Sequence, residues 1–211
     1  MPQADIIRDT NVVYLTGIVT VAPRFIYQQR GYNIREGVIE VPRLSGTVDR
    51  LPFASESCNI DWIKEGSYIS IDGHMQHRGK VRYPDVENRL VAFVDMARIA
   101  SPSLKAENIV ALTGHLCRKP LFRVTPRGKS ICELLVAVAN GNGTQEYCFC
   151  VAWGKVACEV SMLNVGAAIS AEGRFQSREY TKRLDNGETI TKVTHEISLN
   201  TVDLNPSHPS I

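Results

Sequence analysis

Residues 11–31 read NVVYLTGIVTVAPRFIYQQRG, and residues 108–128 read NIVALTGHLCRKPLFRVTPRG. The second stretch repeats the first at an offset of 97 residues, so that Asn11, Leu15, Thr16, Gly17, Pro23, Phe25, Arg30 and Gly31 match Asn108, Leu112, Thr113, Gly114, Pro120, Phe122, Arg127 and Gly128. Farther along the offset is 100, and Gly66, Ile69, Ser70, Gly73, Gln76 and Arg78 match Gly166, Ile169, Ser170, Gly173, Gln176 and Arg178. A period near 100 residues is the size of a small domain rather than of a solenoid repeat. The sequence therefore predicts one β-rich domain present twice.

The composition fits two small cores and argues against a membrane or secreted protein. Hydrophobic residues make up 44% of the 211, and no apolar run reaches the length of a membrane span. The N-terminus has no charged-then-apolar signal pattern, so we expect no secretion. Of the six cysteines, Cys58 is alone in the first half and no CxxC pair occurs. We therefore expect buried, reduced thiols in a cytoplasmic protein, with no disulfide set and no zinc site.

Net charge is only +2, but one short stretch of the second half is strongly basic. The stretch from Gly114 to Ser130 contains no acidic residue, and it carries Arg118, Lys119, Arg123, Arg127 and Lys129. This patch is either a nucleic-acid contact or an ordinary solvated edge.

The second half has the pattern of five strands and one helix. Strands are expected at 108–117, 131–139, 144–153, 167–180 and 188–202, with helical spacing over 155–163. Turn signals separate them, among them Gly141-Asn142-Gly143 and Asp185-Asn186-Gly187. A helix between the third and fourth of five strands is the OB-fold plan, a small Greek-key barrel.

The first half repeats this plan more loosely. Its strands are expected at 11–25, 37–44, 47–54, 68–78 and 89–99, with a short helix near 59–64 that includes Trp62. The fold class is thus all-β with short helices, arranged as two tandem OB-folds. We expect a first domain over 9–99, a linker over 100–107, a second domain over 108–204 and a short tail over 205–211.

Aromatic residues fall on one side of a strand in the second half. Because side chains alternate along a strand, Cys148, Cys150 and Ala152 share the face that suits a barrel interior. The opposite face carries Tyr147, Phe149, Val151 and Trp153, and the next strand places Arg174, Gln176, Arg178 and Tyr180 on one side. Aromatic rings with guanidinium groups between them can stack bases and neutralise phosphates of a single strand. The same rings could instead pack under the helix or against a second subunit.

The second half closely resembles the bacterial single-stranded-DNA-binding protein family. The resemblance rests on Asn108–Gly114, Arg118–Gly128, Leu135–Asn140, Val151–Lys155 and Gly173–Arg178, in that order, with Tyr180 and Val202. In that family the positions that match Tyr147, Trp153 and Tyr180 are plates that stack bases, and the hairpin that matches Thr181–Glu188 also contacts DNA.

The resemblance and the charge pattern together give our candidate nucleic-acid contacts. In the second half these are Arg118, Lys119, Arg123, Arg127, Lys129, Tyr147, Phe149, Trp153, Arg174, Arg178, Tyr180, Lys182 and Arg183. In the first half they are Phe25, Arg30, Phe53, Arg78, Arg82 and Tyr83, with Leu51 as a further possible plate.

Two departures from the family pattern are visible. The first half carries Ser55-Glu56-Ser57 where the family motif has Trp-Gly-Lys, so we expect it to bind more weakly or to serve in assembly. The chain stops at Asn205–Ile211 without the family's acidic tip, which makes partner recruitment by that route doubtful.

The sequence predicts a binding protein and no enzyme. His115 and His195 are isolated on strands, and no paired carboxylates, nucleophile elbow or phosphate loop occurs. We expect sequence-independent binding of single-stranded DNA in replication, recombination or repair, without a cofactor. Family members commonly use four OB-folds, so two per chain imply a homodimer. The alternatives are a primosome-like or structural OB-fold protein whose aromatic face binds protein, and an RNA-binding OB-fold protein.

Overall fold

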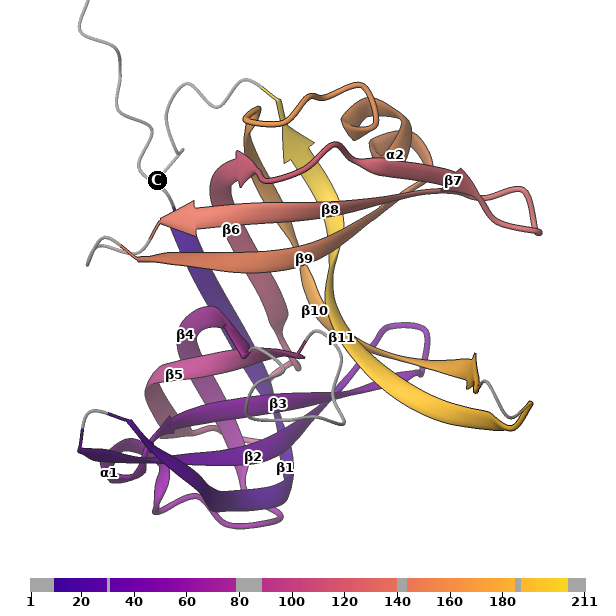
Figure 1. The fold of residues 1–211 in the computed structure, drawn as a ribbon. Helices are drawn as coiled ribbons and strands as arrows, with labels where there is room; N and C mark the ends of the chain where they lie inside the picture. The colour runs from indigo at the N-terminus through magenta and orange to yellow at the C-terminus, as the bar shows by residue number, and fades with distance from the viewer. Residues whose placement is uncertain (1–9, 30, 79–88, 140–143, 185–186, 205–211) are drawn as a thin grey trace, which may run out of the picture. The chain divides into compact units, whose positions relative to one another are not determined.

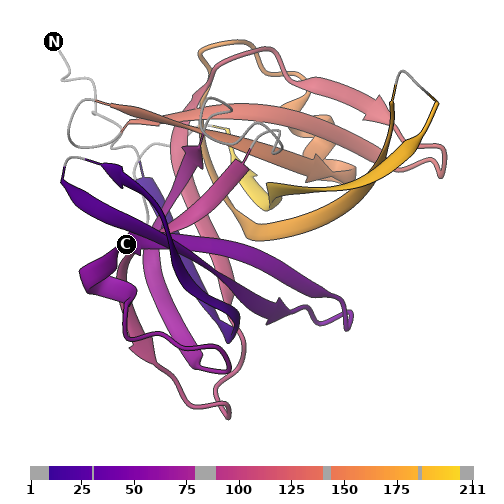
Figure 2. The ribbon, with the colours of Figure 1, turned by 60° about the horizontal axis from the view of Figure 1, so that its bottom comes forward.

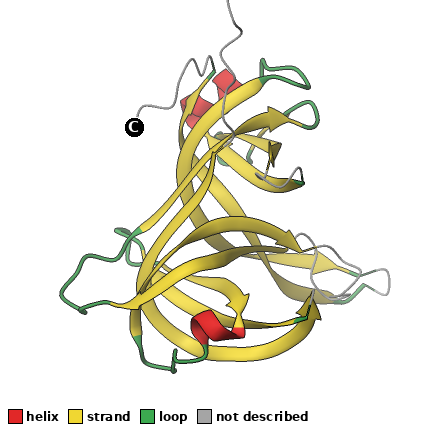
Figure 3. Ribbon diagram, turned by 90° about the vertical axis from the view of Figure 1, so that its left-hand side faces the viewer, coloured by secondary structure: helices red, strands yellow, loops and turns green. Residues whose placement is uncertain are grey.

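The computed structural model describes residues 10–29, 31–78, 89–139, 144–184 and 187–204, and strands dominate these ranges (Figures 1 and 3). The first repeat contains β1 (Thr10–Gln29), β2 (Tyr32–Pro42), β3 (Val48–Glu56), α1 (Ser57–Ile60), β4 (Tyr68–Arg78) and β5 (Arg89–Ile99). The second contains β6 (Asn108–Leu116), β7 (Leu121–Val124), β8 (Ser130–Ala139), β9 (Gln145–Trp153), α2 (Gly154–Val160), β10 (Ala168–Arg183) and β11 (Thr189–Asp203).

Each repeat closes into a barrel with the same pairing scheme. In the first, the strand order is β2-β3-β5-β4-β1, and β1 pairs again with β2 in the long curved hairpin of Figure 2. In the second, β6-β10-β11-β9-β8 closes through the β6–β8 pairing. The pairings β3–β5 and β9–β11 are both parallel. With one helix after the third strand, this is the predicted tandem OB-fold.

The two repeats differ in their first strand. In the first repeat β1 runs unbroken through Pro23, with register shifts against β2 that let it bend. In the second the corresponding stretch is split into β6 and β7 around Lys119-Pro120. The sequence did not predict β7, and its four residues are all exposed. Trp62, predicted on the short helix, lies in the turn that follows α1.

Matching glycines stand where one strand backbone presses on another. A Cβ at Gly17 would lie 2.2 Å from the carbonyl oxygen of Glu40, and a Cβ at Gly114 would lie 2.2 Å from that of Ala137. The second matching pair behaves alike, because a Cβ at Gly73 would lie 2.1 Å from the Phe93 oxygen and a Cβ at Gly173 would lie 2.3 Å from the Ser198 oxygen. Any side chain at these positions would force the barrel strands apart.

A matching pair of hydroxyl residues also makes the same bond in each barrel. Thr16 Oγ1 lies 2.9 Å from Ser70 Oγ, and Thr113 Oγ1 lies 3.1 Å from Ser170 Oγ. The sequence identities at offsets 97 and 100 therefore mark equal structural positions, which confirms the interpretation of the chain as a duplicated barrel.

Contacts divide the chain into two compact units, which we describe separately. One, the first-repeat unit, contains Val13–Asn108 together with Phe175–Glu196; the other, the second-repeat unit, is built on Ile109–Arg174 with the strand that follows Glu196. We call Phe175–Glu196 the arm. The predicted boundaries 9–99 and 108–204 follow the chain repeats and stay predictions, since the arm packs with the strands of the first repeat.

A buried carboxylate holds the arm in the first-repeat unit. Asp49 is 1% exposed, and its two oxygens accept hydrogen bonds from Arg43 at 2.7 and 2.5 Å. Asp49 Oδ1 also accepts the backbone N–H of Ser177 at 2.9 Å. The hydrogen bond with Asp49 raises the pKa of the Arg43 guanidinium above its ordinary value.

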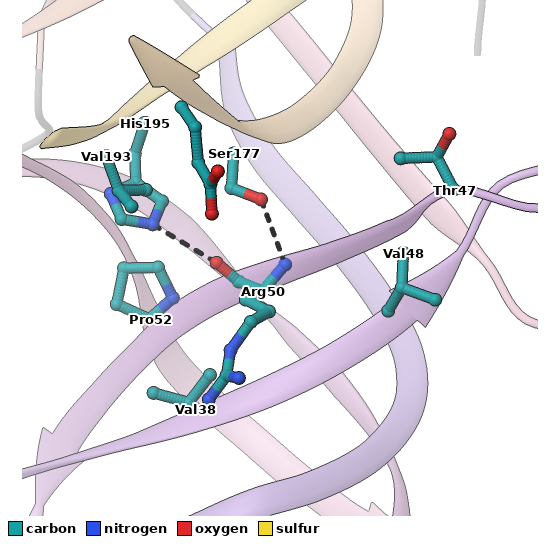
Figure 4. Close-up of a pocket in the computed structure, with 9 residues that line it drawn as sticks. Val38, Thr47, Val48, Arg50, Pro52, Ser177, Val193 and His195 are labelled. Carbon is teal, nitrogen blue, oxygen red and sulfur yellow. Dashed lines mark hydrogen bonds between the residues drawn. The ribbon is translucent and has the colours of Figure 1, made fainter. Parts of the chain in front are cut away.

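Two further hydrogen bonds join the arm to β3. The Arg50 N–H donates to Ser177 Oγ at 3.0 Å, and His195 Nε2 donates to the Arg50 carbonyl oxygen at 3.1 Å (Figure 4). Around them lies a groove of about 430 Å³, whose walls include Val38, Val48, Pro52 and Val193. The arm is thus docked on the β2–β3 side of the first barrel by polar contacts around an apolar groove.

We predict that Gly114→Ala destabilises the protein by about 1–3 kcal/mol, because the new methyl group collides with backbone that cannot rotate away. Urea unfolding measures the loss. Thr201→Ala, an exposed change on β11, serves as the control and should stay within about 0.5 kcal/mol of the parent. Equal stability of Gly114→Ala and the parent would contradict the close approach.

We predict that Asp49→Ala lowers the free energy of unfolding by about 3–5 kcal/mol, since it leaves the Arg43 guanidinium and the Ser177 N–H without their acceptor. Amide exchange at Ser177 should also become faster. The matched control is Asp95→Ala, which removes a surface pair with His74 (Nδ1 to Oδ2, 3.1 Å) and should cost less than about 1 kcal/mol. If both variants unfold at the same urea concentration, the arm is not held by Asp49.

Candidate nucleic-acid interface

The outer face of β8 and β9 in the second-repeat unit presents aromatic rings to solvent. Tyr147 is 44% exposed and Trp153 is 38% exposed, whereas Phe149 between them is partly buried. Cys148, Cys150 and Ala152 alternate with them and are fully buried, as predicted. Burial raises the pKa of the Cys148 thiol to about 12. All six cysteines are free thiols.

Val151, predicted to share the exposed face, is only 1% exposed. It lies opposite Glu133 on β8, and Glu133 in turn lies opposite Leu121 on β7. The Glu133 carboxylate pairs with the Arg123 guanidinium on this side. The middle of the predicted face is therefore covered by neighbouring side chains.

A guanidinium lies in the same cross-strand row as Trp153. The β7–β8–β9 register aligns Arg123 with Ile131 and Ile131 with Trp153, and residues directly opposite each other point to the same face of a sheet. Arg123 is half exposed although it pairs with Glu133. The row therefore combines a base-sized aromatic plate with a cation on one surface.

The other predicted cations of the second repeat lie on exposed turns near β7. Arg118 and Lys119 precede β7, and Arg127 and Lys129 belong to the turn that joins β7 to β8. That turn is fixed by hydrogen bonds from Thr125 N–H to the Lys129 oxygen and from Gly128 N–H to the Thr125 oxygen, both 2.8 Å. Gly128 has φ +73°, a conformation that favours glycine. Arg174, at the end of this unit, is partly buried.

The arm carries its predicted residues in the other unit. Arg178 donates to the buried Glu196 carboxylate from Nε and Nη2, at 3.2 Å each, and its guanidinium carbon lies 6.0 Å from the ring centre of Tyr180. Gln176, predicted on the exposed face, is buried and donates to Glu196 at 2.8 Å. Arg183 is exposed, and the side chain of Lys182 lies outside the described residues. The structure thus groups Tyr147, Phe149, Trp153 and Arg123 in one unit, and Arg178, Tyr180 and Arg183 in the other.

Two first-repeat candidates are buried, contrary to expectation. Phe53, like Leu51, is completely buried in the barrel core, so it has no face free for a base. Arg78 is 7% exposed and donates to Glu36 at 3.2 Å, so it is not a surface contact for phosphate. Phe25 is exposed as predicted, whereas Arg30, Arg82 and Tyr83 lie outside the described residues.

The described histidines, cysteines and acidic residues do not meet the requirements of a metal site. Within the described residues, no three His, Cys, Asp or Glu side chains come close enough together to hold a metal ion. His195 packs beside Phe175, with ring centres 5.9 Å apart. No helix in the described ranges is long and apolar enough to cross a membrane.

Comparison with known proteins gives relatives for the second repeat. The model of the "Single-strand binding protein family" matches residues 107–204, just under half of the chain. The chain is 34% identical over 96 residues to a single-stranded DNA-binding protein of Halalkalibacterium halodurans, which covers 42% of this chain and 57% of that protein. It is 33% identical over 93 residues to single-stranded DNA-binding protein 1 of Staphylococcus aureus, which covers 41% of this chain and 56% of that protein. The chain thus spans little more than half the length of these relatives.

A solved structure matches both repeats together. The wild-type single-stranded DNA binding protein from Thermus aquaticus aligns with a TM-score of 0.72 over 97% of each chain, at 20% sequence identity, which shows that the two proteins share a fold. Over residues 107–204 this chain is similar to the single-strand binding protein family, and its two barrels share the fold of the Thermus aquaticus protein.

Proposed function

We propose that this protein binds single-stranded DNA, without requiring a particular sequence, during replication, recombination or repair. The observation that carries the proposal is the outer face of β8 and β9, where Tyr147 and Trp153 stay exposed and Arg123 lies in the row of Trp153. Large aromatic rings exposed on a sheet can stack bases of any kind, and adjacent cations neutralise the phosphates. The names of the curated relatives support the same ligand.

The second repeat supplies the main binding surface in this proposal. Its cations at Arg118, Lys119, Arg127 and Lys129 are all exposed and surround β7, whereas the first-repeat candidates Phe53 and Arg78 are buried. Arg183 and Lys182 on the arm, with Tyr180, would extend the contact. Binding displaces counterions from the strand, which makes affinity depend on salt.

We further propose that the protein works as a cytoplasmic homodimer, which would bring four OB-folds together, and that it acts without a cofactor or a catalytic step. A dimer related by a twofold axis presents the same binding face twice. Sedimentation of the protein alone, at several concentrations, tests the dimer independently of DNA binding.

We predict that Trp153→Ala weakens binding to a long oligo-dT about 5- to 150-fold at fixed salt, because each stacked base contributes about 1–3 kcal/mol. Fluorescence titration measures the affinity of the parent, and anisotropy of a labelled oligo-dT measures that of the variant. Trp62→Phe is the control. The exposed fraction of Trp62, 40%, is similar to the 38% of Trp153, but Trp62 lies in the turn after α1. Its replacement should leave the affinity for oligo-dT unchanged.

The salt dependence of DNA affinity and the oligomeric state of the variant distinguish a DNA-binding face from a protein interface. The slope of log K against log salt should correspond to about 0.7 per phosphate neutralised. If Trp153→Ala instead falls apart into monomers while its residual DNA affinity is unaltered, the aromatic face binds protein. Competition with oligo-U distinguishes a DNA preference from an RNA preference.

A further inference from the structure

The first-repeat unit contains a second, smaller pocket that none of the candidate nucleic-acid contacts lines. Its volume is about 240 Å³, and it lies where the β1–β2 hairpin faces the ends of β3, β4 and β5. The pocket is lined by Gln29, Tyr32, Ile34, Glu56, Gln76 and Phe93. It is smaller than the roughly 300–1,000 Å³ typical of pockets for drug-sized ligands, so it suits a single ring system.

The polar groups of the pocket have unused hydrogen-bonding capacity. Gln29 Oε1 accepts from the Tyr27 hydroxyl at 3.4 Å, which orients its amide and leaves the NH₂ group to donate. Among the residues that the structure describes, neither the Gln76 amide nor the Glu56 carboxylate has a hydrogen-bond or ion-pair partner. Two amide donors and one carboxylate acceptor therefore border the same small space.

Two aromatic rings supply apolar walls. Tyr32 is 55% exposed, and Phe93 is partly buried with its ring centre 5.3 Å from that of His74. The His74 Nδ1 lies 3.1 Å from Asp95 Oδ2, so the ring beside Phe93 is itself held. Proteins use aromatic rings beside polar groups to stack an unpaired base and to form hydrogen bonds with its edge.

In the neighbouring layer of the barrel, the guanidinium of Arg78 uses only part of its hydrogen-bonding capacity within the described residues. Arg78 follows Gln76 on the same face of β4, as Glu36 follows Ile34 on β2. Arg78 Nη1 donates to Glu36, and its guanidinium carbon lies 5.3 Å from the Tyr27 ring centre. Its Nε and Nη2 are buried and have no partner among the described residues.

The position of Glu56 matches that of Trp153 in the other barrel. Each is the residue that immediately precedes the helix after the third barrel strand, as N-cap of α1 or of α2. The second repeat thus offers a ring at this position, which stacks any base, and the first repeat offers a carboxylate, which accepts a hydrogen bond. This difference changes the chemistry from stacking to edge recognition.

We propose that the pocket binds one unpaired base that bears an exocyclic amino group, which cytosine, adenine and guanine have and thymine lacks, as an addition to the DNA binding proposed above. Glu56 accepts a hydrogen bond from the amino group, and the Gln29 and Gln76 amides donate to ring nitrogens or carbonyl oxygens. Thymine carries a carbonyl oxygen in place of the amino group, which the Glu56 carboxylate repels. The pocket therefore gives the protein a preference in base composition while the second repeat stacks all bases alike.

The test compares oligo-dC and oligo-dT of 30 nucleotides each, with the full chain and two variants. Glu56→Ala should weaken binding of oligo-dC relative to oligo-dT about two- to tenfold, the value expected for one lost hydrogen bond. Glu65→Ala is the matched control, because it removes an exposed carboxylate in the loop after α1 and measures the general effect of one negative charge on phosphate binding. It should change both affinities alike. Gln76→Ala is a second pocket variant, and it should also lower the affinity for oligo-dC relative to that for oligo-dT.

The outcomes separate the pocket from the proposed function. The inference fails if Glu56→Ala, Gln76→Ala and Glu65→Ala all give the same ratio of oligo-dC affinity to oligo-dT affinity while the protein still binds both oligomers. In that case the pocket does not recognise a base. If the parent binds neither oligomer at low salt, the proposed function itself fails. A lowered ratio in both pocket variants, with circular dichroism unchanged, supports the inference.

Discussion

Both repeats depend on close contact between the backbones of neighbouring strands, which occurs at two glycines in each barrel. Gly17 and Gly114 let the first barrel strand approach Glu40 and Ala137, and Gly73 and Gly173 let the fourth strand approach Phe93 and Ser198. At all four, a Cβ would lie within 2.3 Å of a carbonyl oxygen. A five-stranded barrel has a small circumference, so two such approaches fix its closure and its register. Once closed, alternation along each strand decides which side chains face the core.

The two cores fill the same space with opposite choices of residue. In the first barrel Phe53 on β3 pairs with Ala92 on β5, and in the second Cys150 on β9 pairs with Ile197 on β11. All four side chains are buried. In the first barrel the larger residue of the pair is on the third strand, and in the second barrel it is on the last strand. Such an exchange keeps the total volume of the pair similar, as close packing requires. An aromatic residue in the first repeat therefore belongs to the core, although its type alone suggested a base-stacking plate.

The sequence predicted the features that depend on local pattern. Alternation placed Cys148, Cys150 and Ala152 in the interior, where the structure has them. It failed where alternation is interrupted. On β2 both Glu36 and Gly37 are buried, so the alternation of buried and exposed side chains is interrupted there.

It also failed where a contact joins distant residues. Arg78 finds its partner 42 residues away, and Ser177 finds Asp49 across 128 residues, distances over which a local pattern carries no information. The pocket around Glu56 is lined by residues from five strands, so these residues are too dispersed in sequence to form a motif. Only the loss of the tryptophan before the first helix was visible, and it correctly indicated that the two barrels differ at that position.

Docking of the arm makes the surface of the first barrel different from that of the second. On the side of β2 and β3 that would otherwise be free, the first barrel places Arg50 and Pro52 against Ser177 and His195 of the arm. The cost of burying Asp49 is offset only while Arg43 and the Ser177 N–H are both present, since a buried carboxylate without partners is strongly destabilising. The first repeat therefore depends on residues that the second repeat contributes to the chain. The Glu56 pocket lies apart from this docked face, and no residue lines both the pocket and the groove under the arm.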